Sequence, residues 1–338
     1  MQRKAITLFT SLFLVAGCGG GGGGGAGGSG VTPPVASPGP TVAITSNNAV
    51  EVAKASYDTA LDSGEFADLS GTGLFISSTP GGFSKLDAAI AESAKVGNGS
   101  QSQIPIPATT SQCAVSGDVT VSGEIADPIT PTLTEDDFFE IDYNNCDDGF
   151  GDVTDGLVRM EVDSFTGALA DEAFDLTASF TLGMLQIRTG QDVMTSDGTV
   201  SATIDTMNPL SLFTGVSGES MTLDRNQSSE RLTEFSSSMN VDVSLQVPTY
   251  TRSASGTLDS TLLAGVVRYS TPVAFQGLGS DFPNGGEFLV QGAASSLRLI
   301  AENNTDVSIE LDTDGDGNVD ETIETTWAEL MAQGVGSF

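Results

Sequence analysis

The chain has 338 residues, of which 45 are acidic, 12 are basic and none is histidine, so its formal net charge is −33. Phosphate backbones and anionic lipid headgroups repel such a surface, which argues against nucleic acid as a partner. The absence of histidine excludes Ser-His-Asp and Cys-His catalysis and histidine-ligated metal sites. With 38% hydrophobic residues, the chain can nevertheless bury a large core.

The first predicted element is a signal peptide over 1–17. Two basic residues precede an apolar run over 5–15, which is shorter than the ~20 residues that span a bilayer. The run ends in Val-Ala-Gly-Cys18, which resembles the lipobox of bacterial lipoproteins. The resemblance implies that acyl chains, typically palmitate, are attached to Cys18 and that the protein is anchored in the outer membrane, on either face. The alternative is an ordinary cleaved signal with an incidental cysteine.

A tether and a helical segment follow. Residues 18–40 are mainly glycine, serine and proline, which is typical of a linker, and no Lys-Ser or Lys-Thr follows the glycines as in a phosphate-binding loop. We predict a helical N-terminal segment over 41–105, because short helices are indicated at 47–61, entered from Asn47 or Asn48, and after an N-cap at Ser84.

From residue 106 to 338 the hydrophobic period changes to two, which predicts an antiparallel β domain. In 174–184, apolar side chains that we expect to share one buried strand face alternate with polar ones. These are Phe174, Leu176, Ala178, Phe180, Leu182 and Met184. About a dozen strands without helical crossovers indicate a mainly β fold with short N-terminal helices, in which a large antiparallel sheet forms a barrel, a half-barrel or a sandwich.

The same alternation predicts further strands at 158–162, 200–204 and 241–247. Two Asp-Gly pairs, at Asp155-Gly156 and Asp197-Gly198, are predicted to form hairpin turns, because this dipeptide favours two-residue turns between paired strands.

Cys113 and Cys146 are predicted to form a disulfide, because an exported protein meets an oxidising compartment; two buried free thiols are the alternative. Alternating runs on either side of the connection at 127–131 predict a long hairpin. Pairing Val121 with Phe139 aligns its apolar residues.

This register sets Cys113 opposite Asp147 instead of Cys146. One extra residue is therefore needed, and we predict a β-bulge near Asn144-Asn145.

A candidate calcium loop lies in "DTDGDGNVD" at 312–320. Oxygen-bearing residues occupy positions one, three, five, seven and nine of the loop pattern, namely Asp312, Asp314, Asp316, Asn318 and Asp320. Position twelve is Ile323 instead of glutamate, and alternation on both sides predicts a hairpin tip. We therefore expect calcium as a cofactor of weak affinity, about 0.1 to 1 mM, or else an Asp/Gly turn that binds no ion.

The C-terminal region is similar to that of a group of uncharacterised proteobacterial lipoproteins. The matching residues are Pro283, Gly285, Gly292, Asp312, Gly315, Asp316, Gly317, Trp327 and Leu330. The resemblance implies an envelope location and this β architecture, and it brings no established activity. We expect Trp327 to be a core residue.

These observations predict a non-enzymatic envelope lipoprotein whose partner is the membrane that holds its anchor. The acidic run at 135–152 offers carboxylate pairs, but such runs are expected by chance in so acidic a chain. In one hypothesis the sheet surrounds a cavity that binds an apolar, lipid-like small molecule. In the alternative the core is filled and the protein is a calcium-stabilised structural or adhesive surface protein. Phe174, Phe180, Leu182 and Met184 would be cavity walls in the first case and closed core in the second; the sequence does not determine the oligomeric state.

Overall fold

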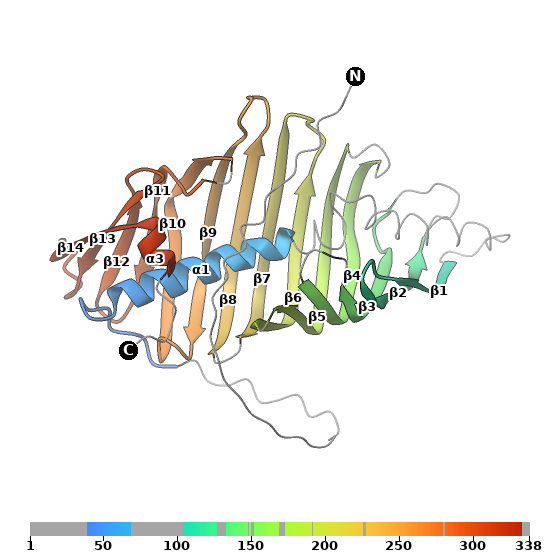
Figure 1. The fold of residues 1–338 in the computed structure, drawn as a ribbon, viewed down its shortest axis with the longest axis horizontal. Coiled ribbons are helices and arrows are strands. Elements are labelled where there is room, and N and C mark those ends of the chain that lie inside the picture. The colour runs from blue at the N-terminus through green and yellow to red at the C-terminus, as the bar shows by residue number, and fades with distance from the viewer. Residues whose placement is uncertain are drawn as a thin grey trace, which may run out of the picture.

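A computed structural model describes the chain over residues 39–68, 104–126, 133–147, 149, 152–168, 173–190, 192–225, 228–279 and 281–332. In these ranges it shows one large sheet with a helix, α1, lying across the strands on one face (Figure 1). The predicted signal peptide, Cys18, the tether up to residue 38, the helix after Ser84 and the connection at 127–131 lie outside the described residues.

The described strands form a single open antiparallel sheet of 14 strands, in which spatial order equals sequence order and β1 and β14 are the two edges. This confirms the mainly β fold. The strands are β1 Ile104–Gln112, β2 Ser116–Ile125, β3 Phe138–Asp147, β4 Asp152–Ala168, β5 Ala173–Thr189, β6 Asp192–Asp205, β7 Ser211–Arg225, β8 Ser228–Asp242, β9 Thr249–Ser260, β10 Gly265–Leu278, β11 Gly285–Gln291, β12 Ser296–Ala301, β13 Asp306–Asp312 and β14 Glu321–Thr326. A short helix, α3, covers Trp327–Ala332.

Helix α1 spans Ala49–Asp68 and begins directly after Asn48, as predicted, although it is longer than the predicted element. The Val52 amide donates to the Asn48 carbonyl (2.9 Å), while the Asn48 side chain accepts a hydrogen bond from the Thr45 amide (2.8 Å) and so closes the preceding turn. Side chains from Val52 to Tyr57 are all buried, because α1 packs against β6–β9 and β11–β13. The helix therefore occupies the core face of much of the sheet.

The predicted buried face of β5 is correct for five of its six residues. From Phe174 to Leu182 the alternate apolar side chains are buried, but Met184 is 67% exposed. The prediction for Met184 is wrong because the register between β5 and β6 shifts between Leu182 and Leu185, and Met184 has a φ of 56°. This β-bulge turns Met184 outward and gives the next core position to Leu185.

The two Asp-Gly pairs are not hairpin turns, and that prediction is wrong. Gly156 lies inside β4 and Gly198 inside β6, with φ values of 116° and 139°. A Cβ on Gly156 would lie 2.9 Å from the Met184 carbonyl oxygen, and Gly198 pairs with Leu182. Both positions need glycine, because their φ is positive and a Cβ atom would lie too close to the backbone of a neighbouring strand.

The strand predicted over 241–247 is also wrong beyond its first residues. β8 ends at Asp242, whose side chain accepts the Ser244 amide (2.8 Å) and turns the chain. Leu245 and Val247 consequently lie exposed in the connection to β9. Alternation alone could not reveal where β8 ends, since the apolar pattern continues past its last residue.

Trp327 is fully buried, which confirms its prediction as a core residue. Its indole Nε1 donates to the carbonyls of Pro283 and Asn303, each at 3.2 Å. The ring stacks on Phe282 with centroids 5.8 Å apart, and the Tyr57 ring of α1 lies 5.3 Å away. This cluster joins α1, α3 and the connection before β11.

Candidate functional site

The predicted calcium loop is the tip of the β13–β14 hairpin. Leu311 pairs with Glu321, and the Asp320 amide donates to the Leu311 carbonyl (2.7 Å), so residues 313–320 form the connection. The hairpin tip predicted from the flanking alternation is therefore confirmed.

Side chains of the loop hold its backbone in place. Asp312 accepts the amides of Gly315 (2.7 Å) and Gly317 (3.0 Å) on its two oxygens. Asp320 accepts the Thr313 amide (2.8 Å) and hydroxyl (2.6 Å). Hydrogen bonds from the Thr313 side chain, and then its backbone, lower the pKa of Asp320, because they favour the ionised carboxylate.

Three carboxylates of the loop converge. One oxygen each from Asp312, Asp314 and Asp320 lies within 4.8 Å of the other two, at the protein surface. Calcium takes six to eight oxygen ligands at roughly 2.3–2.6 Å, and it accepts flexible geometry and water ligands. The triad can therefore supply three protein ligands to a hard cation.

Of the other predicted ligands, Asp316 is not part of this triad. Asp316 accepts the Asn318 amide (2.8 Å) on one oxygen and the Asn318 side-chain Nδ2 (2.9 Å) on the other. Ile323, at position twelve, pairs with Ile309 and packs against the core, while Glu321 accepts a hydrogen bond from the Ser46 hydroxyl. The loop thus gathers three of the four predicted carboxylate ligands.

The disulfide between Cys113 and Cys146 is present, with its Cα atoms 5.5 Å apart. The bulge predicted at Asn144-Asn145 is also confirmed, since Asn145 has a φ of 47° and the β3–β4 register shifts between Tyr143 and Cys146. Cys113 itself lies in the connection between β1 and β2, so the bond fastens that connection to the end of β3.

The predicted register of this hairpin is wrong by two residues. Val121 pairs with Ile141 instead of Phe139, and Phe139 lies opposite Gly123. A shift of two keeps every side chain on its own face, so a period-two pattern cannot distinguish the two registers. The sequence did not indicate β1. Cys113 lies between β1 and β2 and not within the strand predicted from residue 113 onward.

One acid of the 135–152 run has a structural role that the sequence did not reveal. Asp137 is only 1% exposed and accepts the Ala126 amide (2.7 Å) and the Thr134 amide (2.8 Å) on separate oxygens. The side chain thereby fastens the chain before β3 to the end of β2. Both oxygens are occupied, which favours the structural reading of this carboxylate over a catalytic one.

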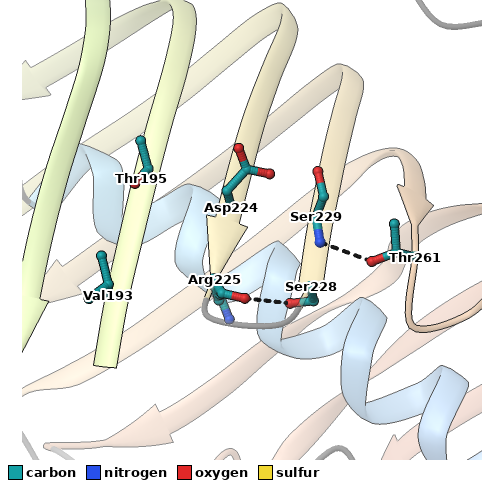
Figure 2. Close-up of a pocket in the computed structure, with 7 residues that line it drawn as sticks. All are labelled: Val193, Thr195, Asp224, Arg225, Ser228, Ser229 and Thr261. Atoms are coloured by element: carbon teal, nitrogen blue, oxygen red, sulfur yellow. Dashed lines mark hydrogen bonds between the residues drawn. The ribbon is translucent and has the colours of Figure 1, made fainter. Parts of the chain in front are cut away.

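A shallow, open groove lies where β6 and β8 begin and β7 and β9 finish (Figure 2). Its lining is Val193, Thr195, Asp224, Arg225, Ser228, Ser229 and Thr261. The Ser229 amide donates to the Thr261 hydroxyl (2.9 Å), so part of the polar lining is already hydrogen-bonded. Six of its seven lining residues are polar or charged, and the groove is open to solvent, unlike the enclosed apolar cavity of the carrier hypothesis.

Comparison with known proteins gives no match to a protein family, a curated protein or a solved structure. Among the residues that the structure describes, no helix has both the length and the apolar character to cross a membrane. Function must therefore be argued from the site itself.

Proposed function

We propose that this chain is a non-enzymatic envelope protein, held at the outer membrane by acyl chains on Cys18, whose β domain has a structural or adhesive role and is stabilised by calcium. The observation that carries the proposal is the convergence of three carboxylate oxygens at the tip of the β13–β14 hairpin.

The loop geometry supports a cation in preference to an empty turn. Hydrogen bonds from Thr313, Gly315 and Gly317 already hold Asp312 and Asp320 in place, which reduces the entropy lost on binding. The three carboxylates repel one another when no cation is present, and a divalent ion removes that repulsion. Three protein ligands without a bidentate glutamate correspond to weak, millimolar-range binding.

The core favours a structural role over lipid carriage. Phe174, Phe180 and Leu182, which would line a cavity, are buried at 4% exposure or less, and Met184 points away from the core. Helix α1 occupies the core face over β6–β9 and β11–β13. Where α1 crosses the sheet, its buried side chains occupy the core face, which supports the structural role.

Thermal unfolding with and without calcium tests the proposal. The thermal midpoint should rise with millimolar calcium and return with chelator, because a ligand that binds only the native state stabilises it by mass action. Asp314→Asn should abolish the rise. Asp316→Asn is the matched control, since it removes the same charge from a carboxylate outside the triad.

Two outcomes would overturn the calcium site. One is a wild-type midpoint that millimolar calcium leaves unchanged, together with no heat of binding in titration calorimetry. The other is an equal loss of the rise in Asp314→Asn and Asp316→Asn, which would indicate diffuse attraction to an acidic surface.

The anchor has a separate test. Cys18→Ser should move the protein from the membrane fraction to the soluble fraction in detergent-free extracts while leaving its thermal midpoint unchanged, because residue 18 precedes the described fold. Mature wild-type protein that carries no acyl chains on Cys18 in mass spectrometry would contradict the lipid anchor and leave the calcium test unaffected.

A further inference from the structure

Three connections at one end of the sheet lie next to exposed apolar side chains, which belong to two of these connections and to the adjoining ends of β7 and β10. In an antiparallel meander every second connection lies at the same end, which places β6–β7 (206–210), β8–β9 (243–248) and β10–β11 (279–284) together. The first two stand at the upper edge of the sheet in Figure 1. We call their exposed residues the apolar rim: Met207, Leu210, Phe213, Leu245, Val247 and Leu278.

The rim is continuous. The Val243 amide donates to the Leu210 carbonyl (2.9 Å), which joins the β6–β7 and β8–β9 connections. The Gly279 amide donates to the Pro248 carbonyl (2.8 Å), which joins β8–β9 to β10–β11. The rim therefore presents its side chains from one ordered strip.

The rim is an exception on this surface. Single exposed apolar residues are common on proteins, but six of the eleven large ones in the described ranges gather here. Residues 206–210 and 243–248 contain no charged side chain, although the whole chain has 57. Clustered, uncharged and exposed, these side chains fit an apolar partner.

The observations favour a lipid surface as that partner. The rim consists of projecting tips, which can enter a bilayer without a matching pocket. Asp205 and Asp242 flank it and accept the amides of Met207 and Ser244 (both 2.8 Å), and the exposed Asp281 lies in the third connection, so three carboxylates would stand beside the headgroups. They disfavour anionic lipid and leave zwitterionic lipid as the better match.

The proposed anchor can reach the same bilayer, and in this respect the inference rests on the proposed function. Gly39 lies at the opposite end, where its amide donates to Asp259 (3.1 Å) beside the β9–β10 connection. The 21 residues of 18–38 span at most about 70 Å when extended. A strand of 15 residues, such as β8, is about 50 Å long. The greatest span of this segment therefore exceeds the length of a strand, so the anchor and the rim can reach one bilayer.

We propose that the apolar rim inserts into the interface of a zwitterionic bilayer, so that the domain contacts the membrane through Met207, Leu210, Leu245 and their neighbours while the acyl chains hold it there.

The test places an environment-sensitive fluorophore on a single new cysteine of the full lipidated chain, added to phosphatidylcholine vesicles. Cys113 and Cys146 are bonded and Cys18 is acylated in the proposed anchor, so the label reports one site. Leu245→Cys labels the rim. Val319→Cys is the matched control, because it is similarly exposed (52% against 61%) but lies on the β13–β14 connection at the other end.

We expect a blue shift and quenching by lipid-attached quenchers at position 245 and neither at 319. Adding Leu210→Ser and Val247→Ser to the labelled protein should lower the extent of quenching, and in chain lacking acylation should weaken vesicle binding roughly tenfold or more, because two apolar side chains no longer enter the bilayer. Equal thermal midpoints of these variants would show that the fold is intact.

Three results would overturn the proposal. The label at 245 could remain accessible to an aqueous quencher like the label at 319. The shift could appear without vesicles and grow with protein concentration, which would assign the rim to a second copy of the chain. It could require a protein partner instead of lipid. Failure of the anchor can be distinguished from failure of the rim. Without acylation the tether would no longer hold the chain on floating vesicles. If the rim inserts, the label at position 245 would still shift to the blue when vesicles are added.

Discussion

The two edges of the open sheet, at β1 and at β14, are held in different ways. At the β14 end, aromatic side chains from α1, β10 and the β10–β11 connection pack around Trp327 of α3, and α1 crosses β11–β13. At the β1 end, the Cys113–Cys146 disulfide and the buried Asp137 fasten short connections. An open sheet has two edge strands with neighbours on one side only, so each end needs tertiary support. The core cluster also includes residues of β1–β5, so the comparison shows that packing against two helices supports one side, whereas packing and a covalent bond together support the other.

The largest expected effect is at the aromatic end. Trp327→Ala removes the ring contacts with Tyr57 and Phe282 and both indole hydrogen bonds. We expect the free energy of unfolding, measured by urea denaturation, to fall by about 3–5 kcal/mol. Trp327→Phe, which keeps an aromatic ring, should cost less.

Hydrogen exchange of the same variant tests whether the ends are separate. Protection should be lost mainly in β11–β14, while β2–β4 should keep it, because their support does not involve Trp327. Equal loss in both regions would mean that the sheet opens as one unit and that the two-ended description is wrong.

The next effect is at the disulfide end. Replacing Cys113 and Cys146 together by serine should lower the free energy of unfolding by about 3–4 kcal/mol, because a closed loop of this size restricts the unfolded chain. Exchange should increase in β1–β3 and remain unchanged in β11–β14. The wild-type protein under reducing conditions is the control, and a decrease spread over the whole sheet would contradict the assignment.

The smallest expected effect is a loss of stability at alkaline pH, and it involves Tyr250 of β9. Burial raises the pKa of Tyr250 to about 12, although attraction to Arg252 opposes the rise. An unfolded tyrosine ionises near pH ~10, so the unfolded state loses this proton first and stability falls as the pH rises from ~10 to about 12. Burial also raises the pKa of Tyr57.

Tyr250→Phe isolates this contribution. The variant loses the hydrogen bond from the Tyr250 hydroxyl to the Asp281 carbonyl (2.9 Å), which should lower its thermal midpoint at every pH. Its further decrease between pH ~9 and ~12 should be smaller than in the wild type. Parallel curves for the two proteins would show that Tyr250 does not titrate differently in the folded state.

The sequence by itself determined the local features. Period-two alternation predicted the strands and the buried face from Phe174 to Leu182, because burial on one side of a pleated strand is written into every second residue. The compartment suggested by the N-terminus predicted the disulfide, and the bulge at Asn145 was placed correctly although the register from which it was derived is wrong by two residues. The Asp/Gly spacing located the hairpin tip at 313–320.

Only the tertiary structure decided what depends on neighbouring strands. Met184 leaves the core and Gly156 lies within a strand because a bulge in β5 changes the register with β4 and β6. The hairpin register shifted by two because alternation is unchanged by such a shift. Packing of α1 decided which strands carry a helix on their core face, and the bonds within the loop decided that Asp320 joins the triad while Asp316 does not. These outcomes depend on contacts between residues far apart in the chain, which no local pattern encodes.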